Sequence, residues 1–430
     1  MTDSIAVTMY NVGFGDCFLL QFPGGRDARP FRILVDCGAH SSGYPAKGWK
    51  PEDVVDEIIA DITEQDGKPA LDIVVATHRH QDHVSGFSAS KWNTVRIGEV
   101  WMPWTEDPRD DLAAVIRNRQ SRLALGLGFA FQSPNFAARW TDPGAADALR
   151  ALAANSLTNE GAMRTLHRGF RGNPERRFLS VGDPATITPE GCPELTVHVL
   201  APSRDPDVIR DMDPPTGQSY LRYVGPGQAL PAEVASTDSA AQVSQKPFTK
   251  SFTLTLAQYE GPPPEGVPPN PTLDPKVKKA AASMMREDDQ SVAVSLDKAV
   301  NGTSLMLMFE FRDAFLFFPG DAQWGSWDRI LQDPSSRELI GKTTFYKVGH
   351  HGSHNATPVE FVEKILQEET PMWGAGASVR PISFWPEIPR SPLLEALATR
   401  AKRLVRSDHP GRSREGVSAK TTRVDFQIPC

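Results

Sequence analysis

Short apolar runs separated by glycine and aspartate turns recur along the first hundred residues. They read IAVTMYNVG, DCFLLQF, FRILVDCG, LDIVVATH and IGEVWMP. Apolar runs of this length, bounded by turn residues, predict buried strands. Between the third and fourth runs, residues 51–65 carry apolar side chains at helical spacing, namely Val54, Val55, Ile58, Ile59 and Ile62. Strands interrupted by an amphipathic helix favour a sheet with helices packed outside it.

The same pattern returns in the second half of the chain. Strands are predicted at LTVHVLAP (195–202) and at QSVAVSLD, TSLMLMFEF, AFLFFPGD and TFYKVGHHGS further on. The chain closes with a predicted helix, SPLLEALATRAKRLV (391–405), and a last strand, TTRVDFQIP. Mixed strands and helices from end to end predict an α/β fold, and we interpret residues 1–430 as one domain.

Two blocks interrupt the pattern. Residues 105–180 contain two helical segments, PRDDLAAVIRNRQSRLAL and DPGAADALRALAANSL, the second with Asp142 as N-cap and Pro143 at the first helical position. We interpret this block as a helical insertion. Residues 203–285 are rich in Pro, Ala, Ser and Thr, and the string EGPPPEGVPPNPTLDP is compatible with neither a helix nor a central strand. We interpret the second block as a long loop insertion, disordered in part.

Composition narrows the class of protein. Of the 430 residues, 40% are hydrophobic and 23% charged, as in a soluble globular enzyme. No run approaches the ~20 apolar residues of a membrane span, and the N-terminus lacks signal-peptide features, so we expect a cytoplasmic protein with no membrane partner. The net charge of −7 argues against a protein that coats nucleic acid. The four cysteines are too few and too scattered for a disulfide framework; they are Cys17, Cys37, Cys192 and Cys430.

Three of the ten histidines lie in one stretch, ATHRHQDHVSG (76–86), directly behind an apolar run. Side chains two residues apart in an extended chain point the same way, so His78 and His80 can reach one metal ion. Asp82 and His83 follow in the next turn and face a neighbouring position. Imidazoles and a carboxylate suit zinc, and also iron or manganese. The alternative, a polar surface turn, is disfavoured by so dense a group directly after a buried strand.

These residues resemble the HxHxDH signature of the metallo-β-lactamase superfamily. The strings ILVDCG, FLFFPGDA and KVGHHGSH resemble three further motifs of that superfamily, in the same order. YNVGFGDCFLL and KVGHHGSH are also similar to the hydrolase domain of ComEC-type competence proteins and their soluble relatives, which include phosphodiesterase-like phosphorylcholine esterases. The resemblance covers residues 5–103, 193–202 and 286–428, and the two inserts lie outside it. It implies an αββα sandwich, in which two mixed sheets pack face to face with helices outside.

The resemblance also implies two divalent metal ions, zinc or alternatively manganese. The implied ligands are His78, His80, Asp82, His83, Asp321 and His351. In this scheme Asp36 braces the metal loop and Asp321 bridges the ions. Asp16 lies in a tight turn, either beneath the site or on a surface hairpin. A metal-bridging hydroxide is the implied nucleophile, with Asp82, Asp321 and His350 as catalytic residues.

Two ligand assignments stay open in the sequence. We favour His351 over His350 as the last metal ligand, which leaves His350 and Ser353 to contact substrate oxygens. The superfamily also places a histidine between the HxHxDH motif and the bridging aspartate. Only His167 and His198 are available there.

The leading hypothesis for function is hydrolysis of a phosphodiester in a small molecule or a nucleic acid. Besides the KVGHHGS string, it draws on RTLHRGFRGNPERR (164–177), whose five arginines include the candidate phosphate contacts Arg168 and Arg171. A solvated surface is the alternative for these arginines. Acyl hydrolysis of a lactone, thioester or β-lactam, and a non-catalytic metal-bound scaffold or sensor, are the alternative functions. The sequence indicates no oligomeric state.

Overall fold

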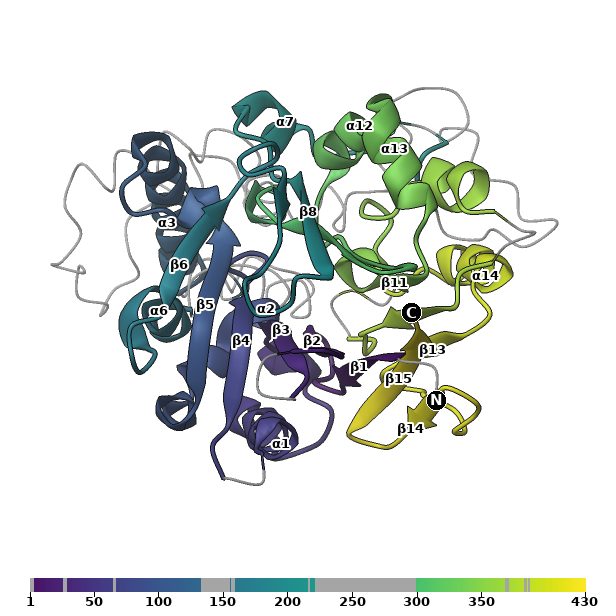
Figure 1. Cartoon of the computed structure of the whole chain (residues 1–430). Coiled ribbons are helices and arrows are strands. Elements are labelled where there is room, and N and C mark those ends of the chain that lie inside the picture. Colours follow the sequence, from purple (N-terminus) through teal and green to yellow (C-terminus); the bar gives the residue numbers. More distant parts are fainter. Residues whose placement is uncertain are drawn as a thin grey trace, which may run out of the picture.

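The protein is an α/β structure with two mixed sheets, as the computed structural model in Figure 1 shows. The structure describes residues 4–25, 29–64, 67–132, 155, 159–215, 217–220, 299–367, 371–382, 385 and 387–430. In these residues one sheet has eight strands and the other has seven. The predicted α/β class is therefore confirmed.

The eight-stranded sheet contains both ends of the described chain. Its order is β14-β15-β1-β2-β3-β4-β5-β6, with β1 Ser4–Tyr10, β2 Cys17–Phe22, β3 Phe31–Cys37, β4 Ala70–Val75, β5 Arg96–Pro103, β6 Glu175–Leu179, β14 Val417–Ala419 and β15 Arg423–Pro429. Strands β3 to β6 run parallel, and the others pair antiparallel. Strand β1 pairs with β15 along its whole length, so the first and last strands of the described chain are neighbours in this sheet.

The seven-stranded sheet collects the second half of the chain. Its order is β13-β12-β11-β10-β9-β8-β7, with β7 Thr186–Ile187, β8 Leu195–Ala201, β9 Met306–Phe311, β10 Ala314–Phe318, β11 Phe345–Lys347, β12 Gly374–Ala377 and β13 Leu404–Arg406. Strands β10 to β13 are parallel. Ligand-binding loops in α/β sheets lie at the carboxyl ends of parallel strands, and the predicted metal ligands follow β4, β10 and β11.

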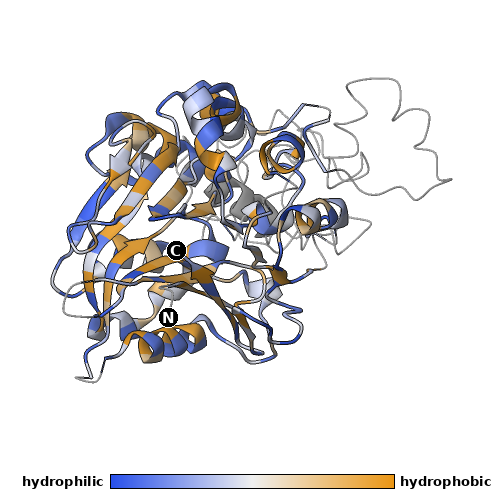
Figure 2. Cartoon of the chain, turned by 45° about the vertical axis from the view of Figure 1, so that its right-hand side comes forward, coloured by the Kyte–Doolittle hydropathy of each residue, from blue (hydrophilic) through white to orange (hydrophobic). Residues whose placement is uncertain are grey.

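Side chains from both sheets meet in one buried core. The ring of Phe18 lies edge-on to that of Phe318, with centroids 5.4 Å apart, and Phe345 lies 5.1 Å from Phe426. Edge-to-face pairs of this kind fill the space between packed sheets and add to the burial of apolar area. Figure 2 shows long hydrophobic stretches on the strands and mixed colours on the surrounding helices.

Helices cover the outer faces of the two sheets. On the eight-stranded sheet, α1 (Pro51–Ile62) buries four of its five predicted apolar residues, Val54, Val55, Ile58 and Ile62. On the seven-stranded sheet lie α12 (Trp324–Gln332), α13 (Pro334–Gly341) and α14 (Ser391–Arg400), where Trp327 packs on Phe317. The order helix, sheet, sheet, helix agrees with a sandwich. No helix in the described ranges has both the length and the apolar character needed to cross a bilayer.

The segment 105–180 is only partly an insertion of helices. Its first predicted helix is α3 (Asp111–Gln132), while the second, residues 142–157, falls almost entirely outside the described residues. A short helix, α6 (Glu160–Arg164), continues into a π-helical turn, Thr165–Gly169. The segment then ends in β6, which pairs in parallel with β5. The last residues of the segment therefore belong to the sheet itself, because β6 is the edge strand of the eight-stranded sheet.

Three further differences from the sequence-based expectations concern local structure. The segment 203–285 begins with a short helix, α7 (Pro206–Arg210), whereas its proline-rich string and the predicted strand QSVAVSLD lie outside the described residues. The helix predicted over 391–405 ends at Arg400, and Leu404–Arg406 forms β13. Strand β12 has the sequence GAGA, which carries no β-branched or aromatic signal and was not predicted.

Candidate metal centre

Asp36 and Thr77 form the base of the site, where two neighbouring parallel strands end. The backbone N–H of Thr77 donates to Asp36 Oδ1 at 2.7 Å, and the Thr77 hydroxyl donates to Oδ2 at 2.7 Å. The same Oδ2 lies 2.8 Å from Nδ1 of His83. Because Nδ1–H of His83 donates to this carboxylate, Nε2 of His83 faces Asp321, 3.1 Å from its Oδ2.

The loop after β4 and the short helix α2 (Gln81–Val84) bring the three histidines of the motif together. His78 and His80 are both buried, with Nε2 of His78 3.1 Å from Nδ1 of His80. The ring of His78 lies 4.1 Å from that of His83, centroid to centroid. Three adjacent buried imidazoles thus present their nitrogens over a small volume, as the HxHxDH pattern predicts.

Asp321 and His351 form the opposite wall, after β10 and β11. His351 donates through Nδ1–H to the backbone carbonyl of Ser378 at 2.9 Å, so its Nε2 points into the site. This Nε2 lies 3.2 Å from Asp82 Oδ2 and 3.7 Å from Asp321 Oδ2. The geometry therefore aims a nitrogen of His351 at both carboxylates.

Asp16 enters the site from the turn before β2. Its backbone N–H donates to the carbonyl of Asp82 at 2.9 Å, and its Oδ1 lies 3.6 Å from Nδ1 of His351. The preceding Gly15 makes this position possible, because a Cβ there would lie 2.3 Å from the carbonyl oxygen of Gly38. Asp16 is thus packed inside the site and is not a surface hairpin residue.

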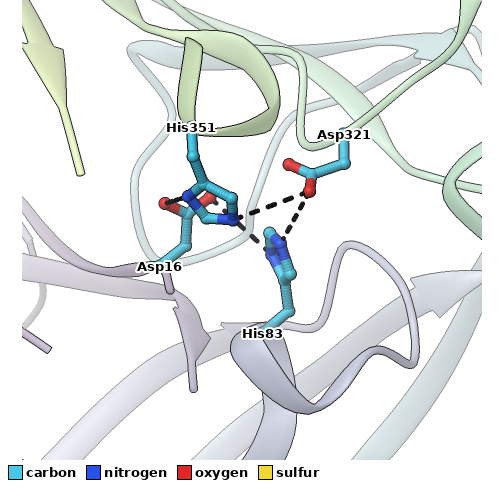
Figure 3. A group of neighbouring side chains, drawn as sticks. All are labelled: Asp16, His83, Asp321 and His351. Atoms are coloured by element: carbon cyan, nitrogen blue, oxygen red, sulfur yellow. Dashed lines mark hydrogen bonds and ion pairs between the residues drawn. The ribbon is translucent and has the colours of Figure 1, made fainter. Parts of the chain in front are cut away.

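Four buried side chains form the centre of the site, each from a different segment of the chain, and Figure 3 shows them pointing toward one another. One ligand atom from each lies within 4.8 Å of the ligand atoms of the other three; the four residues are Asp16, His83, Asp321 and His351. The sequence predicted three of them as metal ligands. Asp16, for which the sequence left open a place beneath the site or on a surface hairpin, lies in the cluster itself.

These residues fit a bound metal ion. Imidazole nitrogens and carboxylate oxygens are ligands that zinc and manganese accept. In addition, Oδ1 of Asp82 and Oδ1 of Asp321 are buried and accept no hydrogen bond from the described residues. A buried carboxylate oxygen without a hydrogen bond is costly, and a cation at this position would remove that cost. The group is therefore a candidate metal centre.

Positive charge already balances part of the carboxylate charge. Burial opposes ionisation of Asp321, yet the neighbouring His83 and Lys347 hold the pKa of its carboxyl well below the usual range. Conversely, burial disfavours a proton on His83, but the surrounding carboxylates raise its pKa well above the ordinary value. Burial lowers the pKa of His78 strongly and that of His80 to about 4. A metal ligand has to be deprotonated, so metal binding would displace a proton from His83.

Lys347, the last residue of β11, was not singled out from the sequence. It is buried, forms an ion pair with Oδ2 of Asp16, and places Nζ 3.5 Å from Oδ1 of Asp321. Burial lowers the pKa of this ammonium. The two carboxylates raise it by more than burial lowers it, so the pKa of Lys347 lies above its ordinary value. The available signal was a lysine at the end of an apolar strand, where a buried charge requires an acidic partner.

His350 lies beside the cluster and is 15% exposed. Its Nε2 is 3.8 Å from Oδ2 of Asp321, and its Nδ1 is 3.3 Å from Oδ1 of Asn355. His350 and His351 both have positive φ, 43° and 52°, in a turn bounded by two glycines. This backbone lets two consecutive imidazoles approach the same site. Ser353 is buried and donates to the same Asn355 oxygen at 3.0 Å.

Neither candidate for the additional histidine ligand lies in the cluster. His167 is part of the π-helical turn, with Nε2 3.6 Å from Oε2 of Glu106. His198 is on β8, with Nε2 2.6 Å from Oε2 of Glu310 on the neighbouring strand β9. Each of these imidazoles thus pairs with a glutamate away from the four-residue cluster.

The arginines of segment 164–177 divide into two groups. Arg176 donates to the backbone carbonyl of Leu166 at 3.2 Å, and Arg177 pairs with Glu99 at 3.0 Å. These two arginines stabilise the edge of the sheet. Arg164, Arg168 and Arg171 are exposed, and no ion pair joins them to the cluster within the described part of the chain. Their contact with phosphate stays a prediction.

Comparison of the sequence with protein-family models and with curated proteins gives no match. The class of protein therefore has to be described from its fold and its site alone. It is an α/β protein of two stacked mixed sheets, with a buried His and Asp cluster at the ends of parallel strands that is capable of holding metal.

Proposed function

We propose that the protein is a metal-dependent hydrolase of the metallo-β-lactamase type that acts on a phosphodiester. The observation that carries the proposal is the buried cluster, in which His83, Asp321 and His351 follow the carboxyl ends of parallel strands and meet Asp16 from the turn before β2. Structural charge pairs seldom leave carboxylate oxygens without hydrogen bonds, whereas a metal centre needs such oxygens.

The implied ligands would hold two divalent ions. They are His78, His80, Asp82, His83, Asp321 and His351. Bound ions of this kind lower the pKa of water and polarise the oxygens of the substrate. The chain itself fixes the directions of the ligands, because Asp36 orients His83 and the Ser378 carbonyl orients His351. Such fixed ligands need little reorganisation when charge develops in the reaction.

A substrate would approach from the side of His350. This imidazole is 15% exposed, whereas the side chains of His83 and His351 are fully buried. Two features support a phosphodiester over an acyl substrate. The string KVGHHGS resembles that of ComEC-type hydrolases and their phosphodiesterase-like relatives, and Arg168 and Arg171 are exposed cations within the insert.

The test is a substrate panel. Protein reconstituted with zinc or with manganese is assayed against bis-p-nitrophenyl phosphate, single- and double-stranded DNA, RNA, and a lactone, with Asp321→Ala as the matched inactive control. We expect turnover of at least one phosphodiester that depends on metal and is lost in the control. Turnover of the lactone alone would assign the acyl-hydrolase alternative, and metal binding without any turnover would favour a scaffold or sensor.

A further inference from the structure

A chain of polar side chains runs from the backbone of Asp321 to His350. The Gln323 side-chain amide donates through Nε2 to the Asp321 carbonyl at 3.0 Å, and Asn355 donates through Nδ2 to Oε1 of Gln323 at 2.6 Å. Oδ1 of Asn355 then lies 3.3 Å from Nδ1 of His350. Gln323 and Asn355 are almost completely buried, so these hydrogen bonds do not compete with bulk water.

The direction of every hydrogen bond in this chain follows from its first member. A backbone carbonyl can only accept, so the amide nitrogen of Gln323 faces Asp321 and its oxygen faces Asn355. That oxygen requires the Asn355 nitrogen as donor, which leaves the Asn355 oxygen toward His350. An oxygen facing Nδ1 requires a proton on Nδ1.

The opposite edge of the imidazole agrees with this assignment. In a neutral imidazole with a proton on Nδ1, the other nitrogen, Nε2, carries a lone pair. The side-chain amide nitrogen of Asn301 lies 3.4 Å from Nε2 of His350, a long contact to that lone pair that a nearer water or hydroxyl donor can replace. Ser353 also donates to Oδ1 of Asn355 at 3.0 Å, which agrees with the orientation of Asn355 that Gln323 sets. Both flanks of His350 thus define the same tautomer.

We propose that Asn355 and Gln323 are positioning residues, which hold His350 with its proton on Nδ1 and its Nε2 lone pair toward the reacting groups. The proposal rests on the proposed function and deepens it by giving His350 the role of proton acceptor. A lone pair repels a phosphoryl oxygen, which can itself only accept, so His350 contacts a water or a substrate hydroxyl. The sequence had indicated a contact with substrate oxygens without defining its direction.

In hydrolysis of a phosphodiester, a water molecule first gives one proton to Nε2 of His350. The oxygen of the hydroxide so formed then bonds to phosphorus, and the second water proton stays on the new phosphate oxygen. The bond from phosphorus to the leaving oxygen breaks with its electron pair, and that oxygen takes a proton from solvent. His350 then returns its extra proton to solvent and is neutral again.

The experiment reads the tautomer directly. Protein labelled with ¹⁵N at its histidines is examined by long-range ¹H–¹⁵N correlation, metal-free and zinc-loaded, and the His350 signals are assigned by their absence in His350→Gln. We expect the Nδ1–H pattern in the wild type. Asn355→Leu removes the acceptor and should shift His350 toward Nε2–H, whereas Asn355→Asp keeps an oxygen opposite Nδ1 and should retain the pattern.

The same variants are assayed on the phosphodiester that the wild type cleaves. Asn355→Leu should lower kcat roughly 10- to 100-fold with little change in KM, and Asn355→Asp should restore most of it. Gln323→Leu repeats the test if Asn355→Leu fails to fold. The matched control is Gln21→Leu, because Gln21 also has a part-buried amide hydrogen bond, to Arg32, but at the far end of β2 from Asp16.

The outcomes separate this inference from the proposed function. An Nε2–H pattern in the wild type, or a pattern unchanged in Asn355→Leu, overturns the positioning role even if phosphodiesters are cleaved. A shifted pattern with unchanged kcat overturns the role of proton acceptor. If the wild type cleaves no phosphodiester, the proposed function fails with the proton-acceptor role, while the spectra still decide whether Asn355 sets the tautomer.

Discussion

Nδ1 of His83 lies 2.8 Å from Oδ2 of Asp36, and this contact directs the opposite nitrogen of His83 toward Asp321. Asp36 itself has positive φ, 56°, and is held by two hydrogen bonds from Thr77. A strained residue at the end of a buried strand persists only where surrounding contacts fix it. The orientation of His83 therefore depends on a carboxylate that is not itself one of the four clustered residues.

Removing this carboxylate should weaken metal binding. We expect Asp36→Ala to reduce zinc affinity roughly 10- to 100-fold, because an imidazole without its partner loses both orientation and basicity. The affinity is measured by competition with a chromophoric chelator. Asp56→Ala, which removes an exposed carboxylate of α1, is the control and should bind as the wild type does. Equal affinities for all three proteins would show that Asp36 has no such role.

The metal content should follow the predicted ligand set. Purified wild type is expected to carry about two equivalents of zinc or manganese, as in two-metal hydrolase sites. Asp321→Ala should carry less and should be inactive, because this carboxylate lies between the histidines of both walls. Elemental analysis before and after reconstitution is the measurement. Absence of any transition metal after reconstitution would contradict the metal centre.

The two consecutive histidines should respond differently to substitution. His351→Ala is expected to lose metal as well as turnover, since its Nε2 points at Asp82 and Asp321 from a fully buried position. His350→Ala should retain metal and lose turnover, since its imidazole is partly exposed beside the cluster. Metal content and kcat measured on both variants decide the matter, and the reverse pattern would exchange the two roles.

Much of the strand order could be predicted because apolar runs with clear boundaries dominate this chain. The pattern of apolar residues failed to predict strands where the packing of neighbouring elements, and not the character of the side chains, determines the secondary structure. Strand β12 consists of glycine and alanine, and Gly376 packs against Met9 and Phe345 in a space with little room for larger residues. Residues 404–406 continue an apolar helical pattern but pair with β12 instead, because parallel pairing there completes the sheet.

The site, too, contains residues that the sequence could predict and residues that it could not. The HxHxDH motif is local, so its spacing alone indicates that His78, His80 and His83 converge. Lys347 and Asn355 have no such local signature, because their partners lie on segments far away in the sequence. Asp16 could be located near the turn but not inside the cluster, since its position depends on the close approach of three separate backbones.

Lys347 should matter most when no metal is bound. Its ammonium is the buried partner of Asp16 and lies near Asp321. Breaking such a buried pair costs about 3–5 kcal/mol, because it leaves a buried carboxylate without compensation. Metal ions compensate the same carboxylates, so zinc should stabilise Lys347→Met more than it stabilises the wild type. The measurement is Tm with and without zinc. An equal zinc-induced shift in both proteins would contradict this coupling.

A second buried charge group joins the metal loop to segment 105–180. Arg79, between two histidines of the motif, places Nε 3.0 Å from Oε1 of Glu106, and His167 lies 3.6 Å from the other oxygen. Asn159 donates to the backbone carbonyl of Arg79. Burial alone would raise the pKa of Glu106, but Arg79, His167 and Arg117 lower it from its ordinary value of 4.5 to about 2.

This depressed pKa predicts how stability depends on pH. A carboxyl whose pKa is lower in the folded state stabilises the protein above its unfolded pKa and loses that contribution as pH falls toward the folded value. For Glu106 the pH window runs from 4.5 down to about 2, and the full contribution to the free energy of unfolding is on the order of 3 kcal/mol.

Urea unfolding should therefore show Glu106→Gln less stable than the wild type at pH 7, with a difference that shrinks as pH falls below about 4.5. The control is Glu338→Gln, which removes one partner of an exposed pair with Lys342 and should change stability by about 1 kcal/mol or less. A difference for Glu106→Gln that stays constant with pH would mean that Arg79 and His167 do not hold this carboxyl ionised.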